Sequence, residues 1–152
     1  MLVLDTPADI RKYVGKEIGV SDWIVVDQGT IDKFADATGD HQWIHVDVER
    51  ARRELPTKET IAHGFLTLSL IPRLAATIYR VAKRTRGVNY GLNKVRFTNM
   101  VPAGARVRLR QTIKQVDDMP DGGIRIISES MVEIEGKDRP ACVAETIGIA
   151  YS

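Results

Sequence analysis

Two different spacings of apolar residues divide the second half of the chain. Between Gly64 and about Val81, apolar residues recur at almost every position of a helical repeat, with no polar stripe. A helix that is apolar all round is buried on most of its sides. Pro72 removes one hydrogen bond from this helix, so a bend is expected there. The apolar residues are Phe65, Leu66, Leu68, Leu70, Ile71, Leu74, Ala75, Ala76 and Ile78.

From Asn89 onward the apolar period changes to two, which is typical of strands with one buried face. One set of alternating residues is Val107, Leu109 and Ile113 against Arg106, Arg108 and Arg110. A second set is Ile124, Ile126, Val132 and Ile134 against Arg125, Glu129, Glu133 and Glu135. Val143, Ile147 and Ile149 predict a last strand, and the glycine-containing segments 121–123 and 135–138 predict the turns. The arginines therefore indicate a solvated outer face.

The first third of the chain is expected to be helical and irregular. Thr6 followed by Pro7 predicts a short helix over about residues 7–14, and Trp23–Val26 predicts a short strand. Asp27 or Thr30 can cap a further helix that ends at Gly39. One buried helix followed by an antiparallel meander indicates an α+β domain in which the sheet wraps around the helix.

Composition limits the classes of protein to which the chain can belong. Its 152 residues fit a single domain covering 1–152, and a net charge of +2 without a recognised binding motif does not favour nucleic acid. The N-terminus lacks the features of a signal peptide, and no apolar run is long enough for a membrane span. The single cysteine, Cys142, lies in an apolar run and is predicted to be a buried, inert thiol. These features lead us to expect a cytoplasmic protein.

Acid and imidazole groups gather in one short segment that precedes the long helix. All three histidines fall between residues 41 and 63, and Asp40 and His45 lie five residues apart after Gly39. A carboxylate and an imidazole that converge on one water can polarise it and transfer its protons in both directions. The backbone N–H of Gly64, at the start of the long helix, is suited to stabilising negative charge on an oxygen. We predict Asp40, His45 and Gly64 as catalytic residues.

Simpler roles exist for the same residues. Asp40 could be a turn residue after Gly39, and His45 could be a buried structural histidine. His41, His45 and Asp40 could also be read as metal ligands, but Gly39 and Trp43 do not favour the helix that such a histidine pair needs, so no metal is expected. His63 could line a pocket, cap the helix or support the catalytic loop.

The segment around Asp40 resembles the signature of R-specific enoyl-CoA hydratases and MaoC-like dehydratases. The matching residues are Phe34, Thr38, Gly39, Asp40, His45 and Ala51. Ala-His-Gly at 62–64 and Arg-Phe at 96–97 also resemble family landmarks, and the resemblance spans about residues 18–150. The chain departs from the family where Gln42 and Trp43 replace the usual Asn-Pro, which affects the expected substrate chain length and loop geometry.

The resemblance implies a hot-dog fold that dimerises and acts on thioesters of CoA or acyl-carrier protein. It implies a hydro-lyase that interconverts trans-2-enoyl and 3R-hydroxyacyl forms without a cofactor, in which Asp40 and His45 activate water and the Gly64 amide is the oxyanion donor. A thioesterase on the same fold is the second hypothesis. A non-catalytic acyl-thioester-binding protein, as in the NodN-like group, is the third.

Six further residues are candidates for binding the substrate: Gln42, Trp43, His63, Phe65, Lys94 and Arg96. CoA carries several phosphates, and arginine is suited to bidentate contacts with phosphate. The basic residues near the end of the long helix and on the following strand are therefore candidates for these contacts.

Overall fold

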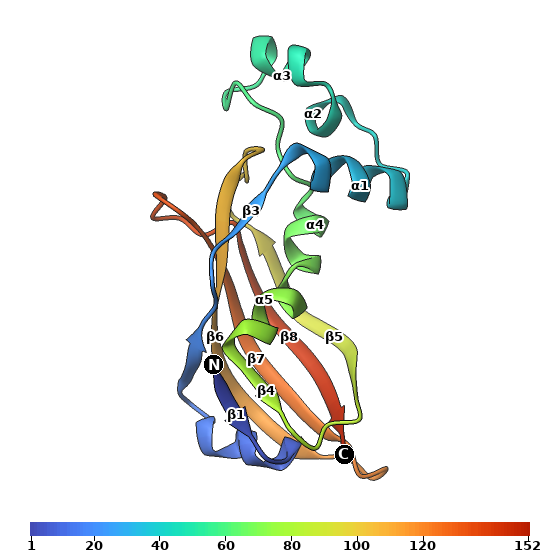
Figure 1. Ribbon diagram of the computed structural model, residues 1–152, viewed down its shortest axis with the longest axis vertical. Coiled ribbons are helices and arrows are strands. Elements are labelled where there is room, and N and C mark those ends of the chain that lie inside the picture. Colours follow the sequence, from blue (N-terminus) through green and yellow to red (C-terminus); the bar gives the residue numbers. More distant parts are fainter.

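An antiparallel sheet crossed by a two-part helix forms the body of the computed structural model, which describes residues 1–152 (Figure 1). The order of the strands in the sheet is β2-β6-β7-β8-β5, and β3 pairs with the start of β6. All neighbours in this sheet are antiparallel. The strands are β2 (Glu17–Val20), β3 (Ile24–Val26), β5 (Arg86–Phe97), β6 (Ala105–Asp118), β7 (Ile124–Ile134) and β8 (Cys142–Tyr151). This is the α+β hot-dog arrangement expected from the sequence.

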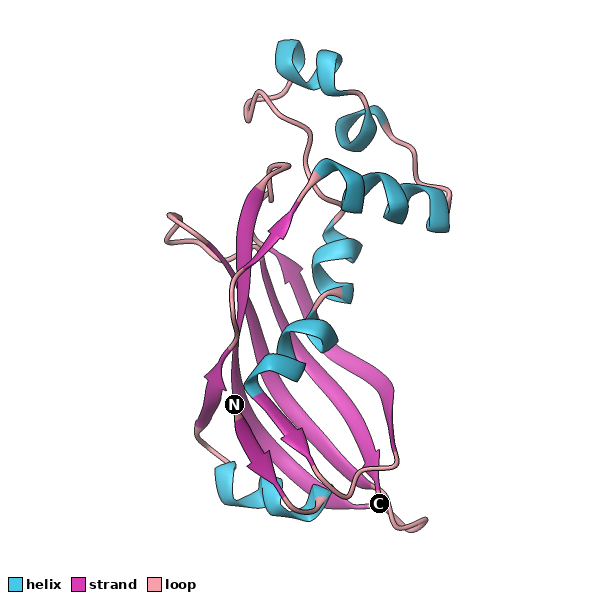
Figure 2. Cartoon of the chain, in the orientation of Figure 1, coloured by secondary structure: helices cyan, strands magenta, loops and turns pink.

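The predicted long helix is present as two segments, α4 (Gly64–Ser69) and α5 (Ile71–Ile78), which run across one face of the sheet (Figure 2). The bend lies at Leu70, whose N–H is shared between the carbonyls of Leu66 and Thr67. Pro72 has no N–H to donate, and its ring clashes with the backbone of the preceding helical turn. The helix therefore changes direction two residues ahead of the proline. Leu66, Leu70, Ile71, Leu74 and Ile78 all belong to the hydrophobic core.

Two expectations about this helix were wrong. It ends at Ile78 rather than near Val81, because β4 (Tyr79–Val81) pairs in parallel with β1 (Leu2–Leu4). The helix also has an uncovered face, on which Phe65 and three further residues at helical spacing are exposed: Ser69, Pro72 and Ala76. The absence of a polar stripe therefore does not mean that the sheet covers the helix on every side.

The alternation predicted for the sheet is confirmed for the central strands. Val107, Leu109 and Ile113 are fully buried, and the intervening arginines form ion pairs on the outer face. The pairs are Arg106–Glu135, Arg108–Glu133, Arg110–Glu133 and Arg110–Glu17. Strand β5 is different, because all of its twelve residues except Val95 are exposed.

A helical overhang covers one end of the sheet (Figure 1). It consists of α1 (Gln28–Thr38), α2 (Trp43–Val46) and α3 (Val48–Glu54). As predicted, Asp27 caps α1 by accepting a hydrogen bond from the Thr30 N–H, and Gly39 ends the helix in the left-handed conformation with φ of 80°. The short helix expected over about 7–14 is the 3₁₀ helix η1 (Pro7–Tyr13). No helix of the structure has the length and apolar character required to cross a membrane.

Cys142 lies at the start of β8 within the hydrophobic core, with no exposed surface. Burial raises the pKa of its thiol to about 11. Because the thiolate is the reactive form, this cysteine is an inert core residue at neutral pH, as the sequence predicts.

Candidate active site

Asp40 follows directly from the end of α1. Gly39 turns the chain in the left-handed backbone conformation, which glycine adopts more readily than any other residue. The Asp40 carboxylate is exposed, and it accepts a weak hydrogen bond of 3.3 Å from the Gln42 N–H. It is therefore oriented by the loop and still accessible to a ligand.

His45 lies in α2 and its side chain is buried, with 6% of its surface exposed. Its Nδ1 lies 2.6 Å from the backbone carbonyl oxygen of Ile61, which can only accept a hydrogen bond. Nδ1 must therefore carry the proton, and Nε2 of the neutral ring has a free lone pair. The Gln28 side chain donates to the His45 carbonyl at 2.8 Å and also accepts a hydrogen bond from Thr60.

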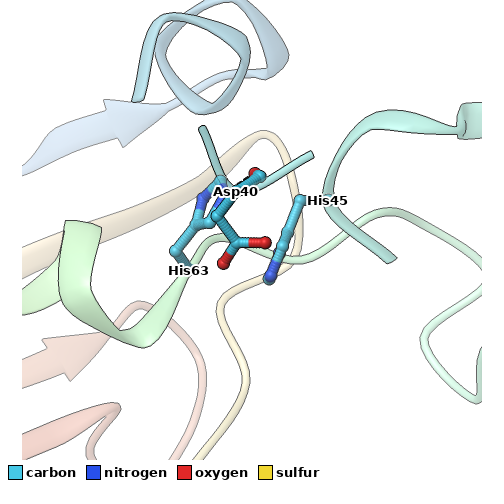
Figure 3. A group of neighbouring side chains, drawn as sticks. All are labelled: Asp40, His45 and His63. Atoms are coloured by element: carbon cyan, nitrogen blue, oxygen red, sulfur yellow. Dashed lines mark hydrogen bonds between the residues drawn. The ribbon is translucent and has the colours of Figure 1, made fainter. Parts of the chain in front are cut away.

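The side chains of Asp40, His45 and His63 converge above the start of α4 (Figure 3). One nitrogen or oxygen atom of each lies within 4.8 Å of the others. Asp40 is on the solvent side of this group, and the two histidines lie beneath it. A water or substrate atom that reaches Asp40 can therefore also reach the His45 ring.

His63 occupies a different place from that expected of a residue that touches substrate. It is 3% exposed, its ring stacks on that of His45 at a centroid distance of 3.8 Å, and the ring of Phe34 packs against it at 4.8 Å. Its Nε2 donates to the backbone carbonyl of Asp40 at 3.0 Å, whereas Nδ1 has no partner. His63 therefore ties the Asp40 loop to the start of α4, which is the supporting role left open by the sequence.

The environment of His45 favours its neutral form. Burial lowers the pKa of the His45 imidazole, and the neighbouring His63 acts in the same direction, whereas the bond to Ile61 and the Asp40 carboxylate partly oppose them. The neutral ring at neutral pH is the form that can accept a proton.

Gly64 is the first residue of α4, so its N–H has no partner within the helix. A side chain at this position would collide with the aromatic ring of Phe97, because an added Cβ would lie 2.7 Å from Cδ2 of that ring. Phe97 also packs edge-on against Phe65, with ring centroids 5.8 Å apart. Glycine thus lets β5 and the start of the helix approach each other beside the Asp40 group.

The geometry of this group does not favour a metal ion. A histidine binds a metal through a lone pair in the plane of its ring, and the planes of His45 and His63 are inclined by only 22° in a stacked arrangement. Their lone pairs therefore lie in nearly parallel planes, which does not suit the ligand angles of a tetrahedral site. His41 is directed elsewhere and pairs with Asp36 at 2.8 Å.

The remaining predicted binding residues surround the site at different distances. Gln42 is exposed beside Asp40, whereas Trp43 packs against the guanidinium of Arg50, which lies 4.0 Å above its ring. Phe65 is exposed next to Gly64, and Lys94 and Arg96 are exposed on β5. The structure thus brings the side chains of Asp40, His45 and His63 together, and His63 directly precedes Gly64.

Four residues at the site were not singled out from the sequence for the roles they have: Gln28, Thr60, Ile61 and Phe97. Three act on residues distant in the sequence, and Ile61 acts through its backbone carbonyl, which leaves no signal in the side-chain pattern. Phe97 was noticed only as part of the Arg-Phe landmark.

Comparisons with known proteins find relatives that cover nearly the whole chain. Residues 9–129 match the family model described as MaoC like domain. The 3-hydroxyacyl-thioester dehydratase Z of Mycobacterium tuberculosis is 48% identical over 147 residues, which is 97% of each chain. Nodulation protein N of Rhizobium leguminosarum bv. viciae is 47% identical over 93% of this chain and 89% of its own. The R-hydratase structure from Pseudomonas aeruginosa superposes with a TM-score of 0.70 at 22% identity, covering 91% of this chain and 82% of that one.

Proposed function

The chain belongs to the MaoC-like domain family, and on that premise we propose that Asp40 and His45 catalyse its reaction, the reversible hydration of trans-2-enoyl thioesters to 3R-hydroxyacyl thioesters. The chain is a hydro-lyase, similar to a 3-hydroxyacyl-thioester dehydratase over nearly its full length. The observation that supports the residue assignment is the convergence of the Asp40 carboxylate and the His45 imidazole, with atoms within 4.8 Å, in a group that includes His63, the residue before Gly64.

In the hydration direction, one water is held between Asp40 and His45. Its oxygen forms a bond to C3 of the enoyl group while the pair takes one proton from it. The electron pair of the C2–C3 double bond moves toward the thioester, and the pair then returns one proton to C2. Asp40 and His45 act as one coupled unit, so their protonation state is restored after each turnover.

Negative charge that develops on the thioester oxygen needs a donor on the other side of the substrate. The Gly64 N–H is free of intrahelical bonds and lies at the positive end of the helix. A single well-placed donor of this kind contributes about 3–4 kcal/mol to stabilising the transition state. Since the thioester itself acidifies C2, we expect the reaction to need no metal and no cofactor.

Incubation with crotonyl-CoA tests the proposed reaction against the second hypothesis. Hydration removes the absorbance of the conjugated double bond without releasing free CoA, whereas a thioesterase releases a thiol. Stereochemical analysis of the product is expected to give the 3R alcohol. Binding of the thioester without either change would instead support a non-catalytic protein.

Replacement of Gly64 by alanine is expected to lower kcat/KM by at least about tenfold, because the new methyl group displaces the Phe97 ring and narrows the approach to the Gly64 N–H. Thermal unfolding measures whether the fold is retained. Gly29→Ala is the matched control, since Gly29 also lies in the first turn of a helix and an added Cβ would meet only Asp27 Oδ1, at 3.6 Å. Equal activities for the two variants would contradict this role for Gly64.

The rate of hydration is expected to fall on the acid side as His45 becomes protonated. The pKa of His45 is lowered, chiefly by burial, so this loss should begin below the ordinary histidine pKa of about 6.5. The same shift makes the free energy of unfolding depend on pH. Above about pH 6.5 the shift leaves the free energy of unfolding unchanged. Below that pH the free energy of unfolding falls until the folded-state pKa is reached, because the unfolded chain binds the proton first. A pH profile of kcat/KM measures the effect, and His41→Gln should leave the acid limb unchanged.

We also propose that the protein forms a homodimer through β5. This strand is at the edge of the sheet, pairs only with β8, and exposes Val88, Tyr90, Leu92 and Phe97. A long apolar edge strand in water is a site for pairing with another chain.

Replacement of Val88 by arginine is expected to shift the mass in solution from about twice 16.9 kDa to 16.9 kDa. A charge at this position opposes burial of the edge. Val25→Arg is the matched control, because Val25 is exposed to a similar extent (52% against 47%) but lies on β3. Light scattering after size-exclusion chromatography measures the mass, and a monomeric wild-type protein would refute the dimer.

A further inference from the structure

A cavity of about 700 Å³ lies between the helix α5 and the sheet, beyond the Asp40 group. Its helical wall runs from Leu68 and Ser69 to Ala75 and Ala76, and Tyr79 and Arg80 of β4 and Arg84 after it extend this wall. The other walls come from β5, β7 and β8, with Gln111 of β6. About half of the lining residues are apolar, among them Ile71, Ile126 and Ile147. None of Asp40, His45 and His63 lines it.

The cavity follows the same helix that carries Gly64. Ser69 lies five residues after Gly64, or about 7.5 Å along α4. Beyond the bend, Ala76 lies twelve residues after Gly64, or about 18 Å along the path of the two segments. A thioester with its carbonyl at the Gly64 N–H can therefore place the distant part of its acyl chain in this cavity. This step depends on the proposed function.

A polar strip interrupts the apolar wall of the cavity where three neighbouring strands face the helix. The Gln111 side-chain nitrogen donates to the Ser130 hydroxyl at 3.1 Å, and Ser130 in turn lies 3.0 Å from the Thr146 hydroxyl. Thr146 donates to the backbone carbonyl of Ser128 at 3.4 Å. Because Thr146 uses its proton there, Ser130 is the donor to Thr146, and every hydroxyl proton of the strip has an acceptor.

One polar atom of this hydrogen-bonded strip, the side-chain oxygen of Gln111, has no partner. Gln111 is 5% exposed and lines the cavity, and its side-chain oxygen has no hydrogen-bond partner. A buried acceptor without a donor destabilises its site, and a ligand that supplies a donor recovers that interaction. The acceptor that remains is the Gln111 side-chain oxygen. A hydroxyl group can donate to this oxygen, whereas an ether oxygen has no proton to donate to it.

We propose that this cavity selects acyl chains that carry a hydroxyl group beyond C3, and that Gln111 is the residue that recognises it. The substrate class is then a hydroxylated medium-chain enoyl thioester rather than a plain fatty acyl one. Gln111 acts on a part of the substrate remote from the reacting carbons, so its effect belongs in binding and KM more than in kcat.

Calorimetric binding to the wild-type protein tests the proposal without requiring turnover. The probes are saturated octanoyl-CoA, its analogues with a hydroxyl on each of the last three carbons in turn, and the matching methyl ethers. One hydroxylated analogue should bind about tenfold more tightly than octanoyl-CoA, and its methyl ether should lose that gain. Equal affinity for the plain chain and all hydroxylated chains would overturn the proposal, even where crotonyl-CoA is hydrated normally.

Gln111→Met assigns the effect to the side chain, because methionine fills a similar volume without an acceptor amide. The preference for the hydroxylated chain should fall to less than about twofold, with tighter binding of octanoyl-CoA. Gln115→Met, on the same strand but exposed, should retain the wild-type preference. A folded Gln111→Met protein that keeps the preference would rule out Gln111. The wild-type comparison decides the ligand class even if this variant fails to fold.

Discussion

Replacement of Asp40 by asparagine is expected to lower kcat/KM for hydration by roughly a hundred- to ten-thousand-fold, which is the range for loss of a positioned acid–base group. The amide has nearly the same shape as the carboxylate but neither accepts nor returns a proton. The readout is the initial rate of crotonyl-CoA hydration, with circular dichroism and thermal unfolding as checks on the fold.

The protein should remain folded after this change because the Asp40 side chain makes few contacts. It is exposed, and its one hydrogen bond, from the Gln42 N–H, remains available to an asparagine oxygen. His63 donates to the backbone carbonyl of residue 40, which the substitution leaves in place. Asp36→Asn is the matched control, since Asp36 is exposed nearby and pairs with His41. Similar rates for the two variants would remove Asp40 from the mechanism.

Replacement of His45 by glutamine is expected to reduce turnover by a similar or larger factor, because the free Nε2 lone pair next to Asp40 is lost. Here a change in stability is also expected. The Ile61 carbonyl loses the donor that lies 2.6 Å away, and leaving a buried acceptor unpaired costs about 1–3 kcal/mol. Partial replacement of that bond by the glutamine amide would reduce the cost.

Activity and stability can be separated for the His45 variant. Rates should be measured well below its unfolding midpoint and normalised to the folded fraction from a denaturant titration. His41→Gln makes the same substitution at an exposed position and should retain both activity and stability. A folded His45→Gln protein with near-normal turnover would be incompatible with water activation by this histidine.

The local features of the fold and site could be predicted because their causes lie close together in the sequence. The Asp27 cap and the Gly39 end of α1 each depend on residues within one turn. The turn between Gly39 and α2 brings Asp40 and His45 together over five residues, so their spacing was informative. The alternation around Val107 and Leu109 depends only on which face of β6 meets the core.

The features that escaped prediction depend on contacts between distant segments. The long helix ends early because Tyr79–Val81 pairs with Leu2–Leu4, at the other end of the chain. Its uncovered face depends on how the distant strand β5 lies against the sheet, where the pairing with β8 is interrupted by register shifts between Asn89 and Gly91 and between Leu92 and Val95. For His63 the sequence left three roles open, because the contacts that support it, the stack on His45 and the bond to the Asp40 carbonyl, join segments that are distant in the sequence.

Because Cys142 is buried, its reaction with a thiol reagent can be used to measure how often the native structure opens locally. The chain has no other thiol, so a thiol-specific reagent modifies a single site. That site is closed to reagents in the native state, and its pKa of about 11 suppresses the thiolate. Labelling therefore requires β8 to separate from the core, and when reclosing is fast the labelling rate reports the free energy of that opening. The substitutions discussed above can thus be ranked for stability by mass spectrometry in the absence of denaturant.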